Sequence, residues 1–410
     1  MYIGAVADDF TGATDLATTL RARGMRAVVV IEDRPVDPAR LADADAVVVA
    51  LKTRTAPVAT AIAASLRAVD RLVDAGAERV YVKYCSTFDS TDEGNIGPVL
   101  DAVLARLEAD RTVVVPSFPA NGRTVREGLL YVGDDLLEDS SMRHHPLTPM
   151  TKSRVRDILA PQTSAAITEI PLHVVHEGVG ALRTAIDDAQ PGYVIIDAVT
   201  DEDLAVIAAA SSHLRVLSGG AALAAGIDAP VGAATGALAP VGPGRLVVCG
   251  SASRKTRAQL ADAAAGGAAM RRIDLDRAVD HPQDEAAAVA AWVRGLPTDA
   301  VPVVYSVAEL TDVRAGSADV SSAVEDVLAS VVSQLVASND VHRIIVAGGE
   351  TSGAVVQRLG ISMLEIGPQL APGVCWSTAS TGDGHRVALA LKSGNFGADD
   401  LFTTAWEVLA

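Results

Sequence analysis

The strongest constraint on the fold is an alternation of short apolar runs, rich in β-branched residues, with longer helical patterns. Runs such as Tyr2–Ala7, Ala46–Leu51 and Val80–Tyr84 are separated by helical stretches such as Thr60–Ala75. Strands joined through helices lie parallel in one sheet, and the helices cover its faces. The pattern therefore predicts an α/β fold with a mostly parallel, doubly wound sheet.

The alternation restarts after a segment rich in proline, glycine and alanine. Ala229–Gly244 contains three prolines and shows little periodicity, which is typical of a linker. A strand pattern at Arg245–Cys249 and a helical pattern at Lys255–Ala265 follow it. We therefore predict two α/β domains, residues 1–235 and 236–410, each a mostly parallel sheet flanked by helices. We expect the active site in the cleft between them.

Charge and cysteine content narrow the class of protein. The 410-residue chain has a formal net charge of -17, which disfavours general binding to nucleic-acid phosphates. Its three cysteines, Cys85, Cys249 and Cys375, lie far apart, so neither a disulfide framework nor a zinc knuckle is expected. No signal-peptide pattern and no run of 18 apolar residues is present. We expect a cytoplasmic protein without a nucleic-acid or membrane partner.

Two adjacent carboxylates stand where the first strand ends and the first helix begins. In open α/β sheets this position faces the ligand crevice, and Asp8 and Asp9 there can accept hydrogen bonds from the hydroxyls of a polyol. The alternative is that Asp9 or Thr11 only caps the helix. We predict that Asp8 and Asp9 bind substrate, because a cap does not require two acids and a glycine.

A long polar loop follows the strand at Val80–Tyr84. It holds a cation, four hydroxyls and a carboxylate, and the run Gly-Asn-Ile-Gly-Pro comes directly after it. Lys83 is a natural counter-ion for a substrate carboxylate, and the alternative is a solvated Ser/Thr turn. The predicted substrate-binding residues of this segment are Lys83, Ser86, Thr87, Asp89 and Asn95.

Two shorter motifs follow the strand at Thr112–Val115. The first is Asn-Gly-Arg-Thr, in which Arg123 can make a bidentate bond to a carboxylate. The second is His-Pro-Leu-Thr-Pro-Met, which begins at His145. Either one alone is equally compatible with a surface turn. We include Arg123 among the predicted substrate-binding residues.

Three glycine-rich turns follow strand patterns in the second half. Gly250–Ser253 joins a strand to a helix, so its N–H groups and hydroxyls can bind phosphate, although it is not a Walker A loop. Ala347–Gly353 carries three glycines, which let the backbone approach a ligand closely. Gly382–Gly384 and Lys392–Gly397 follow, the latter with a cation among glycines. Together these turns predict a cradle for nucleotide phosphates.

Seven short motifs, in this order, resemble those of the four-carbon acid sugar kinase family. They are ADDFTGA, KYCSTFDST with GNIGP, NGRT, HPLTPM, GSAS, AGGETSG and KSGNFG, and they span almost the whole chain. The resemblance implies a sugar-acid-binding N-terminal domain and an ATP-binding C-terminal domain. The second motif is similar to the 3-oxo-tetronate branch, whereas tetronate kinases tend towards K-x-D-S-T with R-G-N. The basic pair Arg254-Lys255 after GSAS departs from the family pattern.

The resemblance implies an ATP-dependent kinase that phosphorylates O4 of 3-oxo-tetronate, with Mg²⁺ on the ATP phosphates. Asp9 and Asp383 are the candidates for the carboxylate that orients the attacking hydroxyl, and the sequence does not choose between them. The metal ligands stay unknown, and a homo-oligomer stays open. The predicted ATP-binding residues are Ser251, Ser253, Gly348, Gly349, Glu350, Thr351, Ser352, Gly353, Gly394 and Gly397.

Three other functions stay open at this point. A tetronate 4-kinase would act on erythronate or threonate instead. An NAD-dependent dehydrogenase would use the glycine-rich turns, but no G-x-G-x-x-G follows a strand. A non-catalytic sugar-acid sensor would not need a second, phosphate-type site. Binding of ATP, of NAD or of neither separates a kinase, a dehydrogenase and a sensor.

Overall fold

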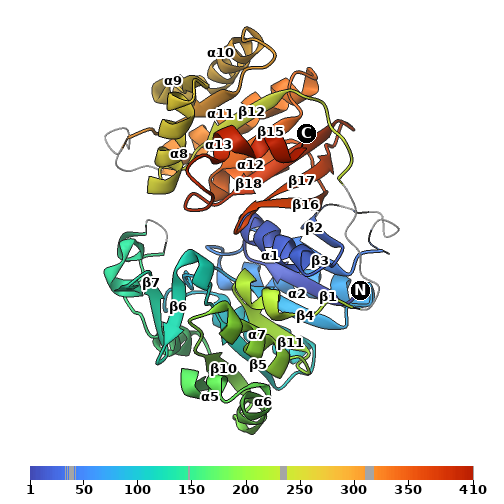
Figure 1. Ribbon diagram of the computed structural model, residues 1–410, viewed down its shortest axis with the longest axis vertical. Coiled ribbons are helices and arrows are strands. Elements are labelled where there is room, and N and C mark those ends of the chain that lie inside the picture. Colours follow the sequence, from blue (N-terminus) through green and yellow to red (C-terminus); the bar gives the residue numbers. More distant parts are fainter. Residues whose placement is uncertain are drawn as a thin grey trace. The chain divides into compact units, whose positions relative to one another are not determined.

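The computed structural model of the chain divides into two compact units, Met1–Gly236 and Ala237–Ala410 (Figure 1). It describes residues 1–32, 34, 36, 41, 43–145, 148–230, 238–309 and 318–409. The boundary predicted at residue 235 lies outside the described residues, as does the middle of the predicted linker.

A parallel sheet forms the centre of the N-terminal unit, in the strand order β2-β3-β1-β4-β11-β5-β10-β9. Its strands are β1 (Ile3–Ala7), β2 (Ala27–Ile31), β3 (Ala46–Ala50), β4 (Arg79–Lys83), β5 (Arg111–Val115), β9 (Ala166–Ile170), β10 (Gly192–Ile196) and β11 (Val216–Gly219). Every residue of β1, β3 and β4 is buried, which suits the apolar runs of β1 and β3. Such runs are typical of parallel strands covered on both faces.

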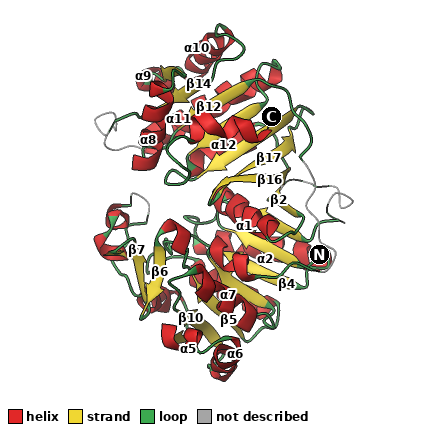
Figure 2. Ribbon diagram, in the orientation of Figure 1, coloured by secondary structure: helices red, strands yellow, loops and turns green. Residues whose placement is uncertain are grey.

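Helices flank this sheet (Figure 2). They are α1 (Phe10–Ala22), α2 (Val58–Asp74), α3 (Ile96–Arg106), α4 (Val155–Leu159), α5 (Leu172–His176), α6 (Val179–Asp188) and α7 (Asp201–Ala210). The α1 helix packs on β1, β2 and β3, and α2 packs on β1 and α3. The α7 helix begins with a capping box formed by Thr200 and Asp203, so its start is fixed by local chemistry.

A small antiparallel sheet interrupts the parallel pattern after β5. It consists of β6 (Arg123–Arg126), β7 (Leu129–Val132) and β8 (Asp135–Leu136). Gly122 turns the chain into β6 with a φ of 69°, a left-handed conformation that suits glycine. Backbone hydrogen bonds in both directions between Phe118 and Arg123 close the loop before β6. Arg123 is therefore held at the first position of a strand.

The C-terminal unit contains a second, mostly parallel sheet in the order β13-β14-β12-β15-β18-β17-β16. Its strands are β12 (Arg245–Cys249), β13 (Ala269–Arg272), β14 (Pro302–Tyr305), β15 (Arg343–Ala347), β16 (Met363–Ala371), β17 (Val374–Ser380) and β18 (Arg386–Lys392). Its helices are α8 (Arg254–Ala265), α9 (Leu275–Asp280), α10 (Pro282–Arg294), α11 (Ala318–Ala337), α12 (Gly349–Arg358) and α13 (Leu401–Thr404). Among the described pairings of this sheet, two are antiparallel: β16 with β17, and β17 with β18.

The α11 helix is apolar over most of its length. Within the described residues, Val320–Ala337 is the one segment that is long and apolar enough to cross a membrane. It packs against α10 and α12, and half of it is buried inside the unit. Core helices of ordinary globular proteins have the same length and composition, so this segment is weak evidence for a membrane span.

The α/β fold predicted from the sequence is confirmed, because mostly parallel sheets flanked by helices are present in both units. The first helix begins five residues before the predicted Asp15, at Phe10, since Asp9 caps it. The antiparallel β6–β8 sheet and the β16–β17 pair were not predicted.

Candidate active site

The strand order of the N-terminal unit places two loops at a position where α/β proteins commonly bind ligands. The chain passes from β1 to β2 and β3 on one side, and then crosses to β4 on the other side of β1. Loops that leave the carboxyl ends of β1 and β4 therefore diverge, and ligands of open α/β sheets bind at such a point. Asp8 and Asp9 follow β1, and the polar loop from Lys83 follows β4.

One guanidinium holds both carboxylates that follow β1. The Nε and Nη2 atoms of Arg54 donate to the two carboxylate oxygens of Asp8, each at 2.8 Å. The same Nη2 lies 2.9 Å from Oδ1 of Asp9. These three side chains are 16–24% exposed, so the cluster is mostly withdrawn from water. Bidentate pairing of this kind fixes geometry as well as charge.

Asp9 caps α1 and also pairs with Arg54. Its Oδ1 accepts from the Gly12 N–H at 2.8 Å, and its Oδ2 accepts from the Thr11 hydroxyl at 2.7 Å. Burial alone would raise the pKa of Asp9, but Arg54 and Lys83, with these hydrogen bonds, hold it below the ordinary value. Asp9 is therefore a carboxylate at neutral pH. With Arg54, three donors occupy three of its about four acceptor positions within the described residues.

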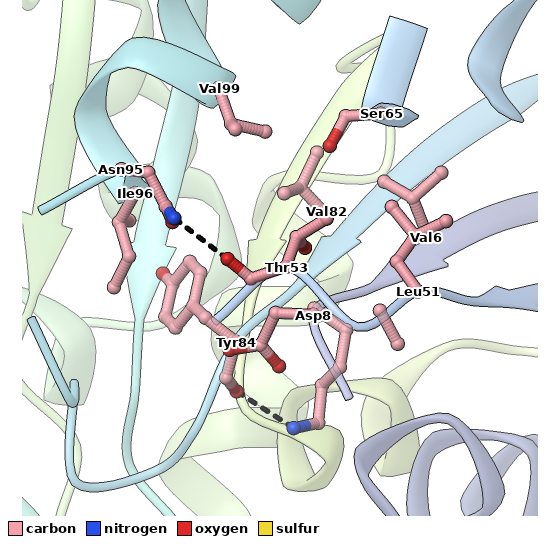
Figure 3. A pocket seen from close by; sticks show the side chains of 12 residues that line it. Val6, Asp8, Leu51, Thr53, Ser65, Val82, Tyr84, Asn95, Ile96 and Val99 are labelled. Carbon is pink, nitrogen blue, oxygen red and sulfur yellow. Dashed lines mark hydrogen bonds between the residues drawn. The ribbon is translucent and has the colours of Figure 1, made fainter. Parts of the chain in front are cut away.

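The backbone around Arg54 is anchored by Asn95. The amide nitrogen of Asn95 donates to the carbonyl oxygen of Thr53 at 2.7 Å (Figure 3). It also donates to the carbonyl oxygen of Ala56 at 3.0 Å. The N–H groups of Thr53 and Arg54 donate in turn to the Asp8 carbonyl oxygen. Asn95 thus positions the segment that carries Arg54, and direct contact between Asn95 and substrate stays a prediction. A cavity of about 30 Å³, large enough for a water molecule, lies beside these side chains.

Lys83 is buried among acids. It is 4% exposed, and its Nζ donates to the Tyr84 carbonyl oxygen at 2.7 Å. The charge of Lys83 lowers the pKa of Asp9 and opposes the effect of burial on Asp15. Burial nevertheless raises the pKa of Asp15 to about 7, and its Oδ1 makes no hydrogen bond with any described residue. The positive charge of Lys83 therefore offsets part of the negative charge of the buried carboxylates Asp9 and Asp15.

The polar loop after β4 is buried rather than solvated, as the side chains of Ser86, Thr87 and Asp89 are at most 8% exposed. Thr87 is bonded to the Cys85 thiol, with 2.8 Å between oxygen and sulfur. Burial raises the pKa of Cys85 to about 11; Asp89 raises it further, while Arg54 and Lys83 lower it. Cys85 is therefore an electrostatic neighbour of several charged residues of the site.

Phe88 interrupts this loop with a φ of 51°, an unusual conformation for an aromatic residue. Its ring is fully buried and meets Tyr84 edge to face at a centroid separation of 5.1 Å. Packing thus holds the backbone next to Asp89 in a conformation that costs energy. Strain of this kind is concentrated at functional sites.

Arg123 belongs electrostatically to the same region. Burial lowers its pKa, and Cys85 and Asp89 act in the opposite direction. Its Nη1 donates to the Asn121 carbonyl oxygen, while its Nε is buried and has no hydrogen-bond partner in the described part of the chain. Arg54 thus pairs with Asp8 and Asp9, while Arg54, Lys83 and Asp89 act on Cys85, and Cys85 and Asp89 act on Arg123. A shared role of these residues in substrate binding stays a prediction.

The C-terminal unit repeats the same winding. Its strand β12 is followed by β13 and β14 on one side and by β15 on the other. A cavity of about 330 Å³ lies at this point, where β12, β15 and β18 end. It is lined by Gly250, Ser251, Ala252, Leu275, Ser306, Val307, Val320, Ser321, Val324, Glu325, Gly348, Gly349, Glu350, Thr351 and Gly394. The predicted turns at Gly250, Gly348 and Gly394 thus meet in one cavity, whereas the predicted Gly382–Gly384 segment does not line it.

Glycine is required where these turns touch. A Cβ on Gly250 would lie 2.1 Å from the Thr351 hydroxyl oxygen, and one on Gly394 would lie 2.3 Å from that of Ser251. Gly348 has a φ of 130°, which a side chain would strain. Backbone hydrogen bonds run from Gly250 to Ala347 and from Gly348 to Lys392, so neighbouring strand ends tie the turns together.

A buried lysine braces the turn after β18. Lys392 is fully buried, and its Nζ donates to the Thr256 hydroxyl and to the Gly394 carbonyl oxygen, each at 3.1 Å. Ser253 caps α8 and donates to the same carbonyl oxygen at 2.6 Å. Burial lowers the pKa of Lys392 to about 8. The hydroxyl of Ser253 thus connects two turns, and a direct contact with ATP stays a prediction.

Besides Ser253, three predicted ATP-binding residues do not line this cavity. Ser352 and Gly353 are buried within the first turns of α12. Gly397 packs against Leu401 and Gln259, with a φ of 88°. These three residues pack within the turns and helix and do not face the cavity.

Asp383 is placed away from the cavity by the structure. It is exposed in the hairpin turn between β17 and β18, closed by a hydrogen bond from the Thr381 N–H to the His385 carbonyl oxygen. Gly394 follows the other end of β18, which has seven residues and is therefore about 20 Å long. Asp383 with its flanking glycines is a turn, so the hypothesis that it orients the attacking hydroxyl is not retained.

The His-Pro-Leu-Thr-Pro-Met motif is only partly described. Pro146 and Leu147 lie outside the described residues. His145 bonds Thr148 through its Nδ1, with the backbone nitrogen at 3.1 Å and the hydroxyl at 2.9 Å. The described part of the motif therefore contains one local pair, His145 with Thr148.

Sequence reasoning missed Arg54, Asp15 and Lys392 as central charges. Arg54 follows the strand Ala46–Ala50, next to β1, so the strand-end rule applied to Asp8 would also have found it. Asp15 lies inside a predicted helix, where nothing in the sequence distinguishes it from a surface residue. Lys392 was noted only as a cation among glycines.

Family models match both halves of the chain. One, described as a sugar-binding N-terminal domain, covers residues 3–227, and another, described as a nucleotide-binding C-terminal domain, covers residues 246–402. A 3-oxo-tetronate kinase of Cupriavidus necator is 43% identical over 99% of this chain and 97% of its own. A protein of the same name from Brucella melitensis is 39% identical over 100% and 96%.

Solved structures share the fold. A crystal structure from Salmonella typhimurium LT2, provisionally assigned to a tRNA synthase, has a TM-score of 0.88 and 38% identity over 98% of both chains. A Haemophilus influenzae protein has a TM-score of 0.75 and 34% identity over 99% of this chain and 100% of its own.

Proposed function

The chain belongs to the four-carbon acid sugar kinase family, and we propose that it transfers the γ-phosphoryl group of ATP to O4 of 3-oxo-tetronate. Full-length relatives at about 40% identity bear the name of this kinase. The observation that carries the proposal is the pairing of two unlike sites in one chain. One is a charged cluster suited to a hydroxy acid, and the other is a glycine-lined cavity suited to phosphates.

The C-terminal cavity has the features of a nucleotide site. Its volume of about 330 Å³ lies within the usual range of ligand pockets. The turn before α8 and the turn before α12 both enter it, and helix N-termini with glycine and serine donors favour phosphate oxygens. We assign ATP contacts to Ser251, Gly348, Gly349, Thr351 and Gly394.

Mg²⁺ would neutralise charge on the ATP phosphates. The ion commonly takes one or two carboxylates together with phosphate oxygens and waters. Glu350 lines the cavity beside the glycines of the same turn, and is the carboxylate that we propose for this role.

The N-terminal cluster is proposed to hold and orient the acid. Phosphoryl transfer depends mainly on positioning and on charge stabilisation, with little covalent work for the protein. The remaining acceptor position of Asp9 is suited to a hydrogen bond from the O4 hydroxyl. Its lowered pKa keeps Asp9 ionised, so we propose that it orients the hydroxyl. Arg54 fixes Asp9 and Asp8 in place.

A cytoplasmic location and the oligomeric state stay predictions, as does the delivery of both substrates to one interdomain cleft. The strongly acidic chain gives no support to a role on tRNA, because nucleic-acid binding relies on cationic contacts to phosphate.

Two carboxylate-to-amide variants test the function. Asp9→Asn should lower kcat by at least about 100-fold, the usual loss when a residue that handles the reacting proton is removed. ATP binding, measured by calorimetry, should persist. Asp383→Asn, a change of the same type in an exposed turn, should keep wild-type turnover. Near-normal turnover of Asp9→Asn would show that Asp9 acts only as a helix cap.

The substrate is tested by comparing kcat/KM for 3-oxo-tetronate, erythronate and threonate, with the phosphorylated position read by NMR. We expect the 3-oxo acid to be the best substrate. A plain tetronate as the better substrate would keep the enzyme a sugar-acid kinase and refute the 3-oxo assignment.

A further inference from the structure

Four side-chain polar atoms between the end of β4 and the start of β6 are buried without a hydrogen-bond partner among the described residues. They are Asp89 Oδ1, Ser117 Oγ, Asn121 Nδ2 and Arg123 Nε. Buried polar groups of folded proteins are nearly always hydrogen-bonded, so a group of orphans in one region requires an explanation. A ligand that supplies the missing partners is one.

Asp89 and Arg123 are opposite charges that do not pair. Asp89 raises the pKa of Arg123 against the lowering effect of burial, which requires that the two groups lie near each other. Within the described part of the chain, however, Arg123 forms no ion pair. Asp89 is 7% exposed, so water does not replace the missing partner freely. Asp89 and Arg123 thus each keep a buried polar atom without a partner among the described residues, and a small polar ligand that contacts both supplies a partner to each.

The other cations of the site are already occupied. Arg54 is bonded to Asp8 and Asp9, and Lys83 donates to a backbone carbonyl oxygen beside buried carboxylates. Among the described cations of this cluster, Arg123 is the one whose side chain keeps a buried donor, Nε, without a described partner. Guanidinium is also the group that matches carboxylate geometry.

We propose that Arg123 and Asp89 form a clamp for the α-hydroxy-carboxylate end of the substrate. Arg123 binds the carboxylate, and Asp89 Oδ1 accepts the hydrogen bond of the 2-hydroxyl. This assignment rests on the proposed function, since it takes the substrate to be a four-carbon acid. It places the acid at Arg123 and leaves the O4 end for Asp9, and it makes Asp89 the residue that reads the configuration at C2.

The backbone holds both members of the clamp firmly. Arg123 begins β6 and exchanges two backbone hydrogen bonds with Phe118. Asp89 follows Phe88, whose left-handed backbone is fixed by its buried ring. Rigid placement of the ligand-binding groups reduces the entropy that binding must overcome.

The carboxylate half of the clamp is tested with erythrulose, which has a CH₂OH group where 3-oxo-tetronate has its carboxylate. The wild-type enzyme should prefer the acid. Arg123→Met should lower kcat/KM for the acid by about 10- to 150-fold, the range for a lost charge-assisted hydrogen bond, and leave erythrulose unaffected. Arg126→Met is the matched control, because Arg126 lies on the same strand and stacks on Tyr131 instead. An equal loss with both substrates would overturn the assignment.

The hydroxyl half is tested with the 2-deoxy acid, 4-hydroxy-3-oxobutanoate, prepared fresh like the substrate. Asp89→Ala should lower kcat/KM for 3-oxo-tetronate by about 10- to 150-fold and affect the 2-deoxy acid little. Asp89→Asn, which keeps the size of the side chain, gives a second variant should the alanine variant not fold. Equal losses for both acids would overturn the role of Asp89.

Calorimetry without ATP separates the clamp from the proposed function. Loss of 3-oxo-tetronate binding in Arg123→Met but not in Arg126→Met supports the clamp even if no phosphoryl transfer is found. Equal binding by both variants overturns the clamp even if the enzyme is a kinase. Absence of transfer to any four-carbon acid would refute the proposed function alone.

Discussion

Substitution of Gly250 by alanine tests the nucleotide cavity most sharply. Its φ lies outside the positive range, so alanine adds no backbone strain. The new Cβ would lie 2.1 Å from Oγ1 of Thr351, about 1.3 Å short of an ordinary contact. Either the turn after β12 or the turn before α12 must therefore move. Both turns line the proposed ATP site.

The cost follows from the size of this clash. Overpacking a well-packed position costs about 1–3 kcal/mol. If the displaced turns bind ATP, this range corresponds to a rise in the KM for ATP of about 5- to 150-fold. The KM for the sugar acid should stay within about twofold, because Gly250 belongs to the other unit. Steady-state kinetics with each substrate varied in turn measures both values.

A second change in Thr351 should relieve the clash. Without Oγ1, the nearest atoms to the new methyl group are Cβ of residue 351 at 3.4 Å and Leu328 Cδ1 at 3.5 Å, both ordinary contacts. The double variant Gly250→Ala/Thr351→Ala should therefore bind ATP better than Gly250→Ala alone. The expected coupling is about 0.5–3 kcal/mol. Thermal unfolding checks that all three variants are folded.

The reasoning is refuted if Gly250→Ala is folded and binds ATP normally, since the two turns would then not form the site. Additive losses in the double variant would also refute it, because the clash with Thr351 could not be the cause.

Two further predictions concern residues that position others. Asn95→Ala removes the amide that holds the segment around Arg54, so the KM for the acid should rise about 10-fold while calorimetry shows unchanged ATP binding; a matching loss of ATP affinity would indicate general unfolding instead. Lys392 should lose its proton as the pH rises through about 8, because burial lowers its pKa from 10.5, so the KM for ATP should increase above that pH. Lys392→Met should abolish this pH dependence, and an unchanged profile in that variant would show that another group titrates.

The sequence predicted the parallel cores because their signal is local. Runs such as Ala27–Ile31 and Ala46–Ala50 are almost entirely buried, and a continuous apolar run records this directly. The turns at Gly250 and Gly348 were equally visible, since glycine marks close approach of backbones. The antiparallel β6–β8 sheet was invisible because its strands are short and half exposed, and they lack a long apolar run.

The charges of the site were harder to rank from sequence. Lys83 was expected to meet the substrate carboxylate, yet its Nζ lies among internal acids, a fact of tertiary packing. Arg54 received no weight, because an arginine in a polar segment usually faces solvent. Asp383 was overvalued, since a Gly-Asp-Gly triplet suits a hairpin turn as well as a ligand site.

The strand order β2-β3-β1-β4 has its counterpart in β13-β14-β12-β15, so each unit carries its own crevice at the strand where its winding reverses. On the proposed function, recognition of the acid then depends on loops of one unit, and recognition of the phosphate donor on loops of the other. Changes at Asp89 or Arg123 leave the turns around Gly250 and Gly348 untouched. Such a division lets a lineage acquire kinases for new acids by altering one half of the gene, while the donor half is inherited intact.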